Sequence, residues 1–369
     1  MRNILMFILI VPIHLFSHIY ADDSSQITVI DSIVNIYANN LMEDSSMIGL
    51  SIGLYNNGEE FFFNFGTIEN GKNISPTKNT IYEIGSITKT FTGILLANAI
   101  LEKKINVEED VRTYLNESYD NLNYKETPIR ILNLANHSSG LPEDIIPKEF
   151  ESLTNPTMFD IVQIFEEDTG SMFLRDLHNV KLDFTPGDNI KYSNTGMILL
   201  GIILEKIYDT KYPLLINRYF TLPLDMKNTE TVLYKSETNN YTIGYDKARK
   251  IMPHITFQIA GAAGGLKSTT SDMINYIKAN INADNKAIEL SHKQTISKNG
   301  QEIGLGWKIR FDLFGEKMLW HDGGEPGFSS YIAIIPDKKI GIICLTNQRG
   351  RQNQLESLSE GIFKNIIHN

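Results

Sequence analysis

Apolar positions near the start of the chain follow first a helical and then a strand-like period. They recur at helical spacing over Ile27–Met42, and two strand-like runs follow, Met47–Tyr55 and Phe61–Thr67, around the turn Asn56-Asn57-Gly58. Apolar residues three to four apart share one helix face, whereas two apolar runs around a Gly-containing turn are typical of a hairpin. We therefore predict a helix followed by a β-hairpin.

The C-terminal third predicts four more strands and a closing helix. Turns rich in Gly, Pro and Asp separate strand-like runs at Gly304–Phe311, Lys317–Trp320, Ser329–Ile335 and Ile340–Thr346, and a helical period begins at about Leu355. Strands joined by tight turns pair antiparallel. The two ends of the chain are therefore expected to share one antiparallel sheet flanked by helices.

Residues 106–253 carry helical periods and polar loops punctuated by proline, which indicates an inserted helical domain. The predicted fold is α/β of the α+β type. A discontinuous sheet domain covers 22–105 and 254–369, and the helical domain covers 106–253. A chain of 369 residues is long enough for two such units.

The first 21 residues resemble a secretory signal peptide. Arg2 precedes the apolar stretch Ile4–Phe16, and Ala21 offers a small residue for cleavage, although Ile19 is larger than the residue usual at its position. The stretch is too short to span a bilayer as an ordinary helix. We expect a mature chain from near Asp22, periplasmic or secreted, with no stable membrane span after cleavage.

Charge and residue counts exclude several classes of function. The net charge is −10 and no basic run offsets it, so we expect no nucleic-acid partner. The eight histidines and one cysteine show no spacing typical of metal ligands, and we expect no metal and no cofactor. Cys344, the only cysteine, lies in an apolar strand-like run and is predicted to be a buried structural thiol.

Ser86 and Lys89 match the pattern Ser-x-x-Lys, which places an amine one helical turn from a hydroxyl that it can deprotonate. Ser75 and Lys78 match it too, but in a loop rich in Gly, Asn and Pro. Ser86 instead follows an extended apolar segment and opens a helical period, where backbone N–H groups are free. We predict Ser86 as the nucleophile; the alternative is a serine that only caps a helix.

Tyr192 and Asn194 form a Tyr-x-Asn pair that is set apart by its surroundings. Other tyrosines, such as Tyr119, also have Asn two places on. Only around Tyr192 does a Pro-Gly turn at 186–187 lead into the pair and a strongly apolar helical run, Met197–Ile207, leave it. Such a frame presents a phenol and an amide from a rigid support, whereas a tyrosine packed beside a turn is the alternative.

His321, Gly323 and Gly324 follow the predicted strand Lys317–Trp320. Glycines allow a substrate backbone to approach a strand edge, and the histidine can orient a carboxylate or the tyrosine oxygen. A rival match, Lys298-Asn299-Gly300, is expected in a polar loop and not on a strand.

A competing signature, Gly49-Leu-Ser-Ile-Gly53, matches the nucleophile elbow of α/β-hydrolases. That elbow requires a strand, a tight turn and a helix. Ser51 is expected in the middle of a strand with a hairpin after it, so we reject the elbow.

In this order, Ser86-x-x-Lys89, Tyr192-x-Asn194 and His321-x-Gly323 resemble the three active-site elements of the serine β-lactamase family, closest to its class C branch and the related D-alanyl-D-alanine carboxypeptidases. The resemblance runs from about Met47 to Asn347. It implies an antiparallel sheet, a helical domain and an active site at their junction. Further landmarks agree: Ile131–Pro142, Gly264–Thr269 with Asp272-Met273, and Gly304–Trp307.

The resemblance also implies a role for each residue. Ser86 is acylated, Lys89 and Tyr192 move protons, Asn194 holds the side-chain amide of the substrate, and the N–H groups of Ser86 and Gly324 form the oxyanion hole. A phenol, with an ordinary pKa of about 10, is a poor base at neutral pH unless nearby cations lower that pKa. Lys89 and Tyr192 are therefore expected to titrate as a coupled pair.

His321 departs from the class C pattern, which has lysine there. Histidine resembles the peptidase, D-aminopeptidase and esterase members, and neutral imidazole attracts a carboxylate less than an ammonium does. Arg310, Asn347 and Arg349 are candidates to bind a substrate carboxylate.

We therefore predict a serine hydrolase acting on small-molecule or peptide amides, either β-lactams or D-amino-acid peptides. The alternatives are an esterase with the same site and a catalytically silent penicillin-binding sensor module.

Overall fold

One large antiparallel sheet organises the protein in the computed structural model, which describes residues 17–167, 170–232, 240–255, 259–282, 285–312 and 315–367. Its eight strands lie in the order β2-β1-β12-β11-β10-β9-β8-β7. The predicted antiparallel sheet built from both ends of the chain is thereby confirmed. The strands are β1 (Gly49–Asn56), β2 (Glu59–Gly66), β7 (Ile296–Lys298), β8 (Gln301–Ile303), β9 (Lys308–Phe311), β10 (Lys317–Glu325), β11 (Phe328–Ile335) and β12 (Ile340–Thr346).

The hairpin β1–β2 and the central strand β12 show why these residues form strands. Asn57 and Gly58 join the hairpin with φ of 49° and 110°, a left-handed pair that favours Asn and Gly. In β12, Ile342 packs into one buried cluster and Ile343 into another. This alternation follows because successive strand residues face opposite sides of a sheet.

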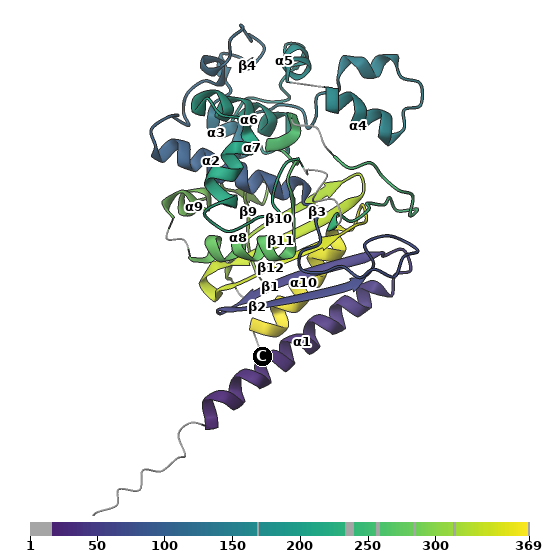
Figure 1. Ribbon diagram of the computed structural model, residues 1–369. Coiled ribbons are helices and arrows are strands. Elements are labelled where there is room, and N and C mark those ends of the chain that lie inside the picture. The colour runs from purple at the N-terminus through teal and green to yellow at the C-terminus, as the bar shows by residue number, and fades with distance from the viewer. Residues whose placement is uncertain are drawn as a thin grey trace, which may run out of the picture.

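Helices cover both faces of the sheet. On one face, α1 (Ser17–Met42) and α10 (Gln352–Ile367) lie side by side, with Ile30 and Val34 in the same buried cluster as Ile362 (Figure 1). On the other face, α8 (Thr270–Asn282) packs against β1 and β12, and α2 (Thr88–Leu101) packs against α9 (Lys286–Ser291). Burial of these apolar faces is the main favourable contribution to folding.

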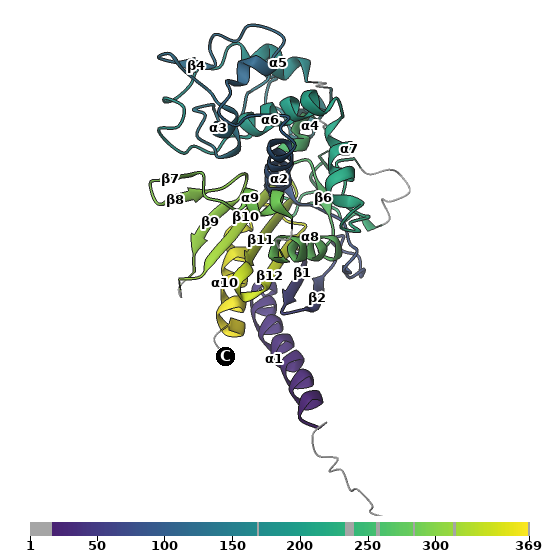
Figure 2. The ribbon, with the colours of Figure 1, turned by 90° about the vertical axis from the view of Figure 1, so that its left-hand side faces the viewer.

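The remaining helices gather beyond one end of the sheet, on the side away from α1 (Figure 2). Two pairs of short strands accompany them, β3 with β6 and β4 with β5. The division into domains at 106 and 253 stays a prediction. The elements are β3 (Tyr82–Glu83), β4 (Asn123–Tyr124), β5 (Thr127–Pro128), α3 (Ile131–Ala135), α4 (Met158–Glu167), α5 (Ser171–Leu177), α6 (Asn194–Tyr208), α7 (Tyr212–Ile216) and β6 (Lys267–Ser268).

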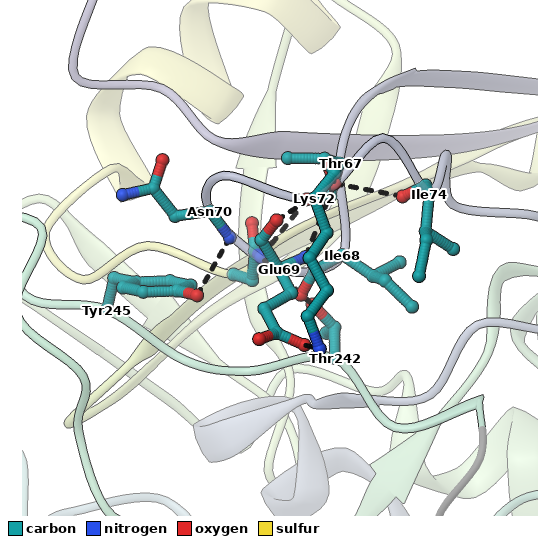
Figure 3. A network of polar contacts seen from close by, with 9 residues as sticks. Thr67, Ile68, Glu69, Asn70, Lys72, Ile74, Thr242 and Tyr245 are labelled. Carbon is teal, nitrogen blue, oxygen red and sulfur yellow. Dashed lines mark hydrogen bonds and ion pairs between the residues drawn. The ribbon is translucent and has the colours of Figure 1, made fainter.

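A polar network anchors the loop that follows β2 (Figure 3). Thr67 Oγ1 lies 2.6 Å from the carbonyl oxygen of Lys72, and the backbone N–H of Asn70 donates to the hydroxyl of Tyr245 at 2.8 Å. The Tyr245 N–H in turn donates to the Asn347 carbonyl just beyond β12 at 3.1 Å. The loop is therefore held to the end of the central strand.

Several local predictions can now be compared with the structure. Ser51 lies in the middle of β1 and is buried, which confirms that no nucleophile elbow forms there, and Cys344 is buried in β12 as expected. Two expectations were wrong. Lys298 ends strand β7 and does not lie in a loop, and β10 continues through the glycines to Glu325, because those glycines pair with β11.

No helix among the described residues has the length and hydrophobicity needed to cross a membrane. The predicted signal peptide falls largely on residues 1–16, which lie outside the described residues.

Candidate active site

Ser86 lies in a single 3₁₀ turn, Gly85–Ile87, between β3 and α2. The residue that caps α2 is Ile87, and Ser86 forms no side-chain cap. The capping alternative is therefore wrong. Gly85 has a φ of +51°, and a Cβ there would come within 2.9 Å of the Gly324 backbone nitrogen, so glycine is required both by conformation and by space.

Lys89 is fully buried in the first turn of α2, with its ammonium nitrogen among three oxygen atoms. Nζ lies 2.9 Å from Ser86 Oγ, 2.7 Å from Asn194 Oδ1 and 2.6 Å from the carbonyl oxygen of Ala263. Two of these partners, the amide and the carbonyl, can only accept hydrogen bonds. A neutral amine that donates its two protons to them directs its lone pair at Ser86.

The surroundings favour this neutral amine. Burial lowers the pKa of Lys89 to about 7, against the opposing effect of the carboxylates of Glu325 and Asp144. Desolvation disfavours the charged form of any buried amine. A large fraction of Lys89 is therefore an uncharged base near neutral pH.

Tyr192 is the second side chain in contact with the Ser86 hydroxyl. Its hydroxyl donates to Ser86 Oγ at 2.5 Å. The next residue, Ser193, fixes the position of Tyr192 through two hydrogen bonds. Ser193 Oγ caps α6 by accepting from the Gly196 N–H at 3.0 Å, and it donates to the Pro142 carbonyl at 2.7 Å. Asn194 is thereby placed as the first residue of α6.

The pKa of Tyr192 is raised well above its ordinary value, chiefly by burial and further by nearby carboxylates such as that of Asp322. This is the opposite of the lowered pKa that the phenol would need in order to act as a base at neutral pH, and its main cause is desolvation. Tyr192 is thus suited to donate a proton, and Lys89 to accept one.

Strand β10 passes directly beside the turn that carries Ser86. A Cβ at Gly323 would overlap the carbonyl oxygen of Ile84, to which Ser330 Oγ also donates at 2.7 Å. Only a strand without side chains at this point can approach the turn so closely. The backbone of Gly324 is consequently next to Ser86.

His321 is buried, and its ring centre lies 6.4 Å from that of Tyr192. Nδ1 lies 2.7 Å from the Asp322 carbonyl, which can only accept, so Nδ1 carries the proton and Nε2 does not. Burial, assisted by Lys308, lowers the pKa of His321 to about 3. The imidazole is therefore neutral throughout the physiological range, and it supplies no positive charge for a substrate carboxylate.

Comparison with known proteins identifies the family. A family model described as Beta-lactamase matches residues 35–362. The chain belongs to the Beta-lactamase family. A β-lactamase of Pseudomonas fluorescens is 26% identical over 361 residues, which cover 87% of this chain and 94% of that protein. The D-alanyl-D-alanine-carboxypeptidase/endopeptidase AmpH of Escherichia coli K12 is 24% identical, covering 89% of this chain and 87% of AmpH.

Two further relatives differ in what they share with the chain. Protein flp of Staphylococcus aureus N315 is 26% identical over 81% of this chain, but the match spans only 59% of flp. A crystal structure of a β-lactamase/D-alanine carboxypeptidase from Pseudomonas syringae superposes with a TM-score of 0.78 at 20% identity, over 91% of this chain and 98% of that one. This likeness confirms the fold.

Two pockets meet at Ser86 in this Beta-lactamase family member, and both also include Asn194 and Gly324. The first, which we call the apolar pocket, has a volume of about 390 Å³. Its other lining residues are Asp144, Ile145, Ile146, Pro147, Phe150, Ile161, Phe165, Phe173, Asp176, Ile198, Ala263, Gly264 and Glu325. The second, the Lys308 pocket, has about 710 Å³ and is also lined by His137, Glu143, Ile190, Tyr192, Gly300, Gln301, Glu302, Ile303, Lys308, Ile309, Arg310, Trp320 and Asp322.

Sequence reasoning missed Lys308, which the structure places 5.8 Å from the Tyr192 ring centre and in an ion pair with Asp322. The sequence did offer one indication of its importance, because Lys308 directly follows the Gly304–Trp307 landmark. Asn347 was one of three residues predicted as candidates to bind a substrate carboxylate. This prediction was wrong, because Asn347 is fully buried and its Nδ2 donates to Thr242 Oγ1 at 2.9 Å. Arg310 lines the Lys308 pocket but pairs with Glu356 and Glu360.

Proposed function

We propose that this protein is a serine hydrolase that forms an acyl-enzyme on Ser86 with peptide-like amides, the class that includes β-lactams and D-amino-acid peptides. One observation carries the proposal: Ser86 Oγ lies between Lys89 Nζ at 2.9 Å and Tyr192 Oη at 2.5 Å. One neighbour is suited to take a proton and the other to give one. The names of the relatives, a β-lactamase and a D-alanyl-D-alanine carboxypeptidase, support the same class.

The proposed reaction begins when the neutral Lys89 amine takes the Ser86 proton as Oγ bonds to the substrate carbonyl carbon. The oxyanion is stabilised by the N–H groups of Ser86 and Gly324. In comparable sites each such donor lowers the activation free energy by about 3–4 kcal/mol. The bond to the leaving group then breaks while Tyr192 donates its proton to the departing atom. The Lys89 ammonium, 4.7 Å from the centre of the phenol ring, returns the proton to Tyr192.

Deacylation follows the same path in reverse, with water in the place of the leaving group. Lys89 is neutral again once it has returned its proton, so the base is regenerated. Water adds to the ester carbonyl, Ser86 Oγ leaves with a proton, and the carboxylic acid departs. No proton is gained or lost by the protein over the cycle.

An ester hydrolase with the same site is the second candidate, and the charges of the Lys308 pocket favour it. Lys308 pairs with Asp322, and Arg310 pairs with Glu356 and Glu360. A cation already paired with a carboxylate attracts a substrate carboxylate less strongly. The Lys308 pocket therefore prefers a leaving group with a carboxylate less strongly than a pocket with an unpaired lysine would. Esters with a neutral leaving group can compete better in it.

The test uses a fluorescent penicillin and a neutral p-nitrophenyl ester, followed by intact-mass spectrometry and peptide mapping. A lasting penicillin adduct on Ser86 indicates a peptidase, and rapid penicillin turnover indicates a β-lactamase. Ester turnover through Ser86 without reaction of penicillin indicates the esterase. An absence of any adduct or turnover with both probes contradicts the hydrolase proposal and favours the silent sensor module.

We also propose that the protein is exported, with cleavage after Ala21. The apolar stretch Ile4–Phe16 behind Arg2 supports this. The test is the N-terminal residue of the protein recovered from outside the cytoplasm. A mature chain that begins at Asp22 agrees with the proposal, and an intact Met1 contradicts it.

A further inference from the structure

The two pockets at Ser86 receive different halves of the substrate, given the proposed function. Tyr192 lines the Lys308 pocket and is absent from the wall of the apolar pocket. The proton donor must touch the atom that departs. The leaving group therefore occupies the Lys308 pocket, and the acyl group, which stays on Ser86, extends into the apolar pocket.

The wall of the apolar pocket combines a hydrophobic lining with negative charge. Seven of its sixteen lining residues are isoleucine or phenylalanine, and its ionisable residues are Asp144, Asp176 and Glu325, with no Lys or Arg among the lining residues. Asp176 is compensated, because it pairs with Arg175 at 2.7 Å. The other two carboxylates face the pocket that opens onto the nucleophile.

Glu325 lies directly beside the nucleophile turn. A Cβ at Gly264 would come within 2.9 Å of its Oε1, and a Cβ at Gly85 within 3.3 Å, so the carboxyl group fills the space that these two glycines leave. Among the described residues, no Lys, Arg or His pairs with it; the same holds for Asp144, whose Oδ1 accepts only from Asn194 Nδ2 at 3.0 Å. Two carboxyl groups that form no ion pair with a basic residue in the described part of the chain thus line the apolar pocket.

We propose that the apolar pocket selects acyl groups that carry a positively charged nitrogen on an apolar body, with Glu325 and Asp144 as the residues that determine this specificity. The charge of the acyl group offsets the two carboxylates, and its carbon framework contacts the isoleucine and phenylalanine wall. Attraction between opposite charges is strong where apolar walls exclude water. The proposal names the acyl side of the substrate and rests on the proposed function.

The charge state of Glu325 adds a pH dependence to this selectivity. Burial, reinforced by the buried Glu83 of β3, raises the pKa of Glu325 to about 8, while Lys267 of β6, Lys89 of α2 and Arg349 after β12 act in the opposite direction. Deprotonation above this pKa creates the negative charge that attracts the acyl cation. The preference for a cationic acyl group should therefore grow as pH rises from 7 to 9.

The experiment compares two p-nitrophenyl esters of equal shape, one of 4-(trimethylammonio)butanoic acid and one of 5,5-dimethylhexanoic acid. The quaternary nitrogen keeps its charge at every pH, so any change with pH belongs to the protein. The quantity is the ratio of the two kcat/KM values, cation over neutral, which we expect to be at least about tenfold in the natural protein at pH 9, above the pKa of about 8 of Glu325. E325Q and D144N should each lower this ratio, and the double variant should bring it close to one.

Glu143→Gln is the matched control, because it removes a carboxylate of the Lys308 pocket and should leave the ratio unchanged. A ratio at or below one in the natural protein, or a ratio unaffected by E325Q and D144N, overturns this inference while turnover of the neutral ester upholds the proposed function. If neither ester acylates Ser86, the proposed function and the inference fail together.

Discussion

At the scale of single residues, the chemistry of the site depends on burial. Lys89 is fully buried, with a pKa lowered to about 7, and the same desolvation raises the pKa of Tyr192. Burial thus separates a base from an acid that would otherwise titrate close together near pH 10. Their common partner is Ser86 Oγ.

Replacing Ser86 by alanine should abolish acylation while the fold persists, because only the hydroxyl is lost and Ser86 caps no helix. Ser75→Ala is the control, since it alters the other Ser-x-x-Lys match. The measurement is the mass of the protein after incubation with penicillin and ester probes, together with its thermal transition. If S75A lost the adduct and S86A kept it, Ser75 would be the nucleophile and our choice between the two motifs would be wrong.

The rate of acylation should rise with pH through the pKa of Lys89, about 7, because the neutral amine is the active form. Below that pH, kcat/KM for a neutral ester should fall about tenfold per unit, as for any single essential base. H321N should keep this profile, since the pKa of His321 is about 3. A loss of this pH dependence in H321N would make histidine the titrating base and contradict the assignment of Lys89.

At the scale of elements, close packing of backbones limits which side chains fit. Gly93 lies inside α2, and a Cβ there would overlap the carbonyl oxygen of Leu305. This contact fixes α2, and with it Lys89, against the segment that precedes Trp307. Helix propensity alone would favour alanine at this position.

Gly93→Ala should therefore destabilise the protein, even though alanine gains about 0.8–1 kcal/mol of helix propensity over glycine. Overpacking of a buried backbone contact typically costs about 1–3 kcal/mol or more and is expected to prevail. The measurement is the urea midpoint of unfolding, with L101A on the exposed side of the same helix as control. An increased midpoint for G93A would show that α2 can move away from Leu305 without penalty.

Local patterns predicted those elements that local physics determines. The Asn-Gly hairpin, the alternating β12 and the helical turn that brings Lys89 to Ser86 all depend on residues close in sequence. The strand at Lys298 and the continuation of β10 through Gly323 and Gly324 were missed, because pairing with a neighbouring strand overrides the weak strand propensity of Lys and Gly.

At the scale of the whole molecule, the site unites segments that are far apart in sequence. Glu325 meets Gly85 and Gly264, and Lys308 approaches Tyr192. The resemblance to a known family predicted Ser86, Tyr192 and His321 as neighbours, yet neither Glu325 nor Lys308 belongs to those motifs. The charges of the two pockets therefore became visible only in the folded chain.

The N-terminal helix α1 offers the last test, because it contributes buried residues to the core. From residue 28 on, where the structure describes its side chains, the buried ones are Ile30, Val34 and Ala38, which pack with α10 and one face of the sheet. Removing residues 1–21 takes away none of them, so the thermal transition and ester turnover should be unchanged. Removing residues 1–42 exposes that face, and each large apolar side chain lost costs about 1.5–3 kcal/mol. That shortened protein should unfold at a clearly lower urea concentration, whereas equal losses for both deletions would place essential packing before Asp22.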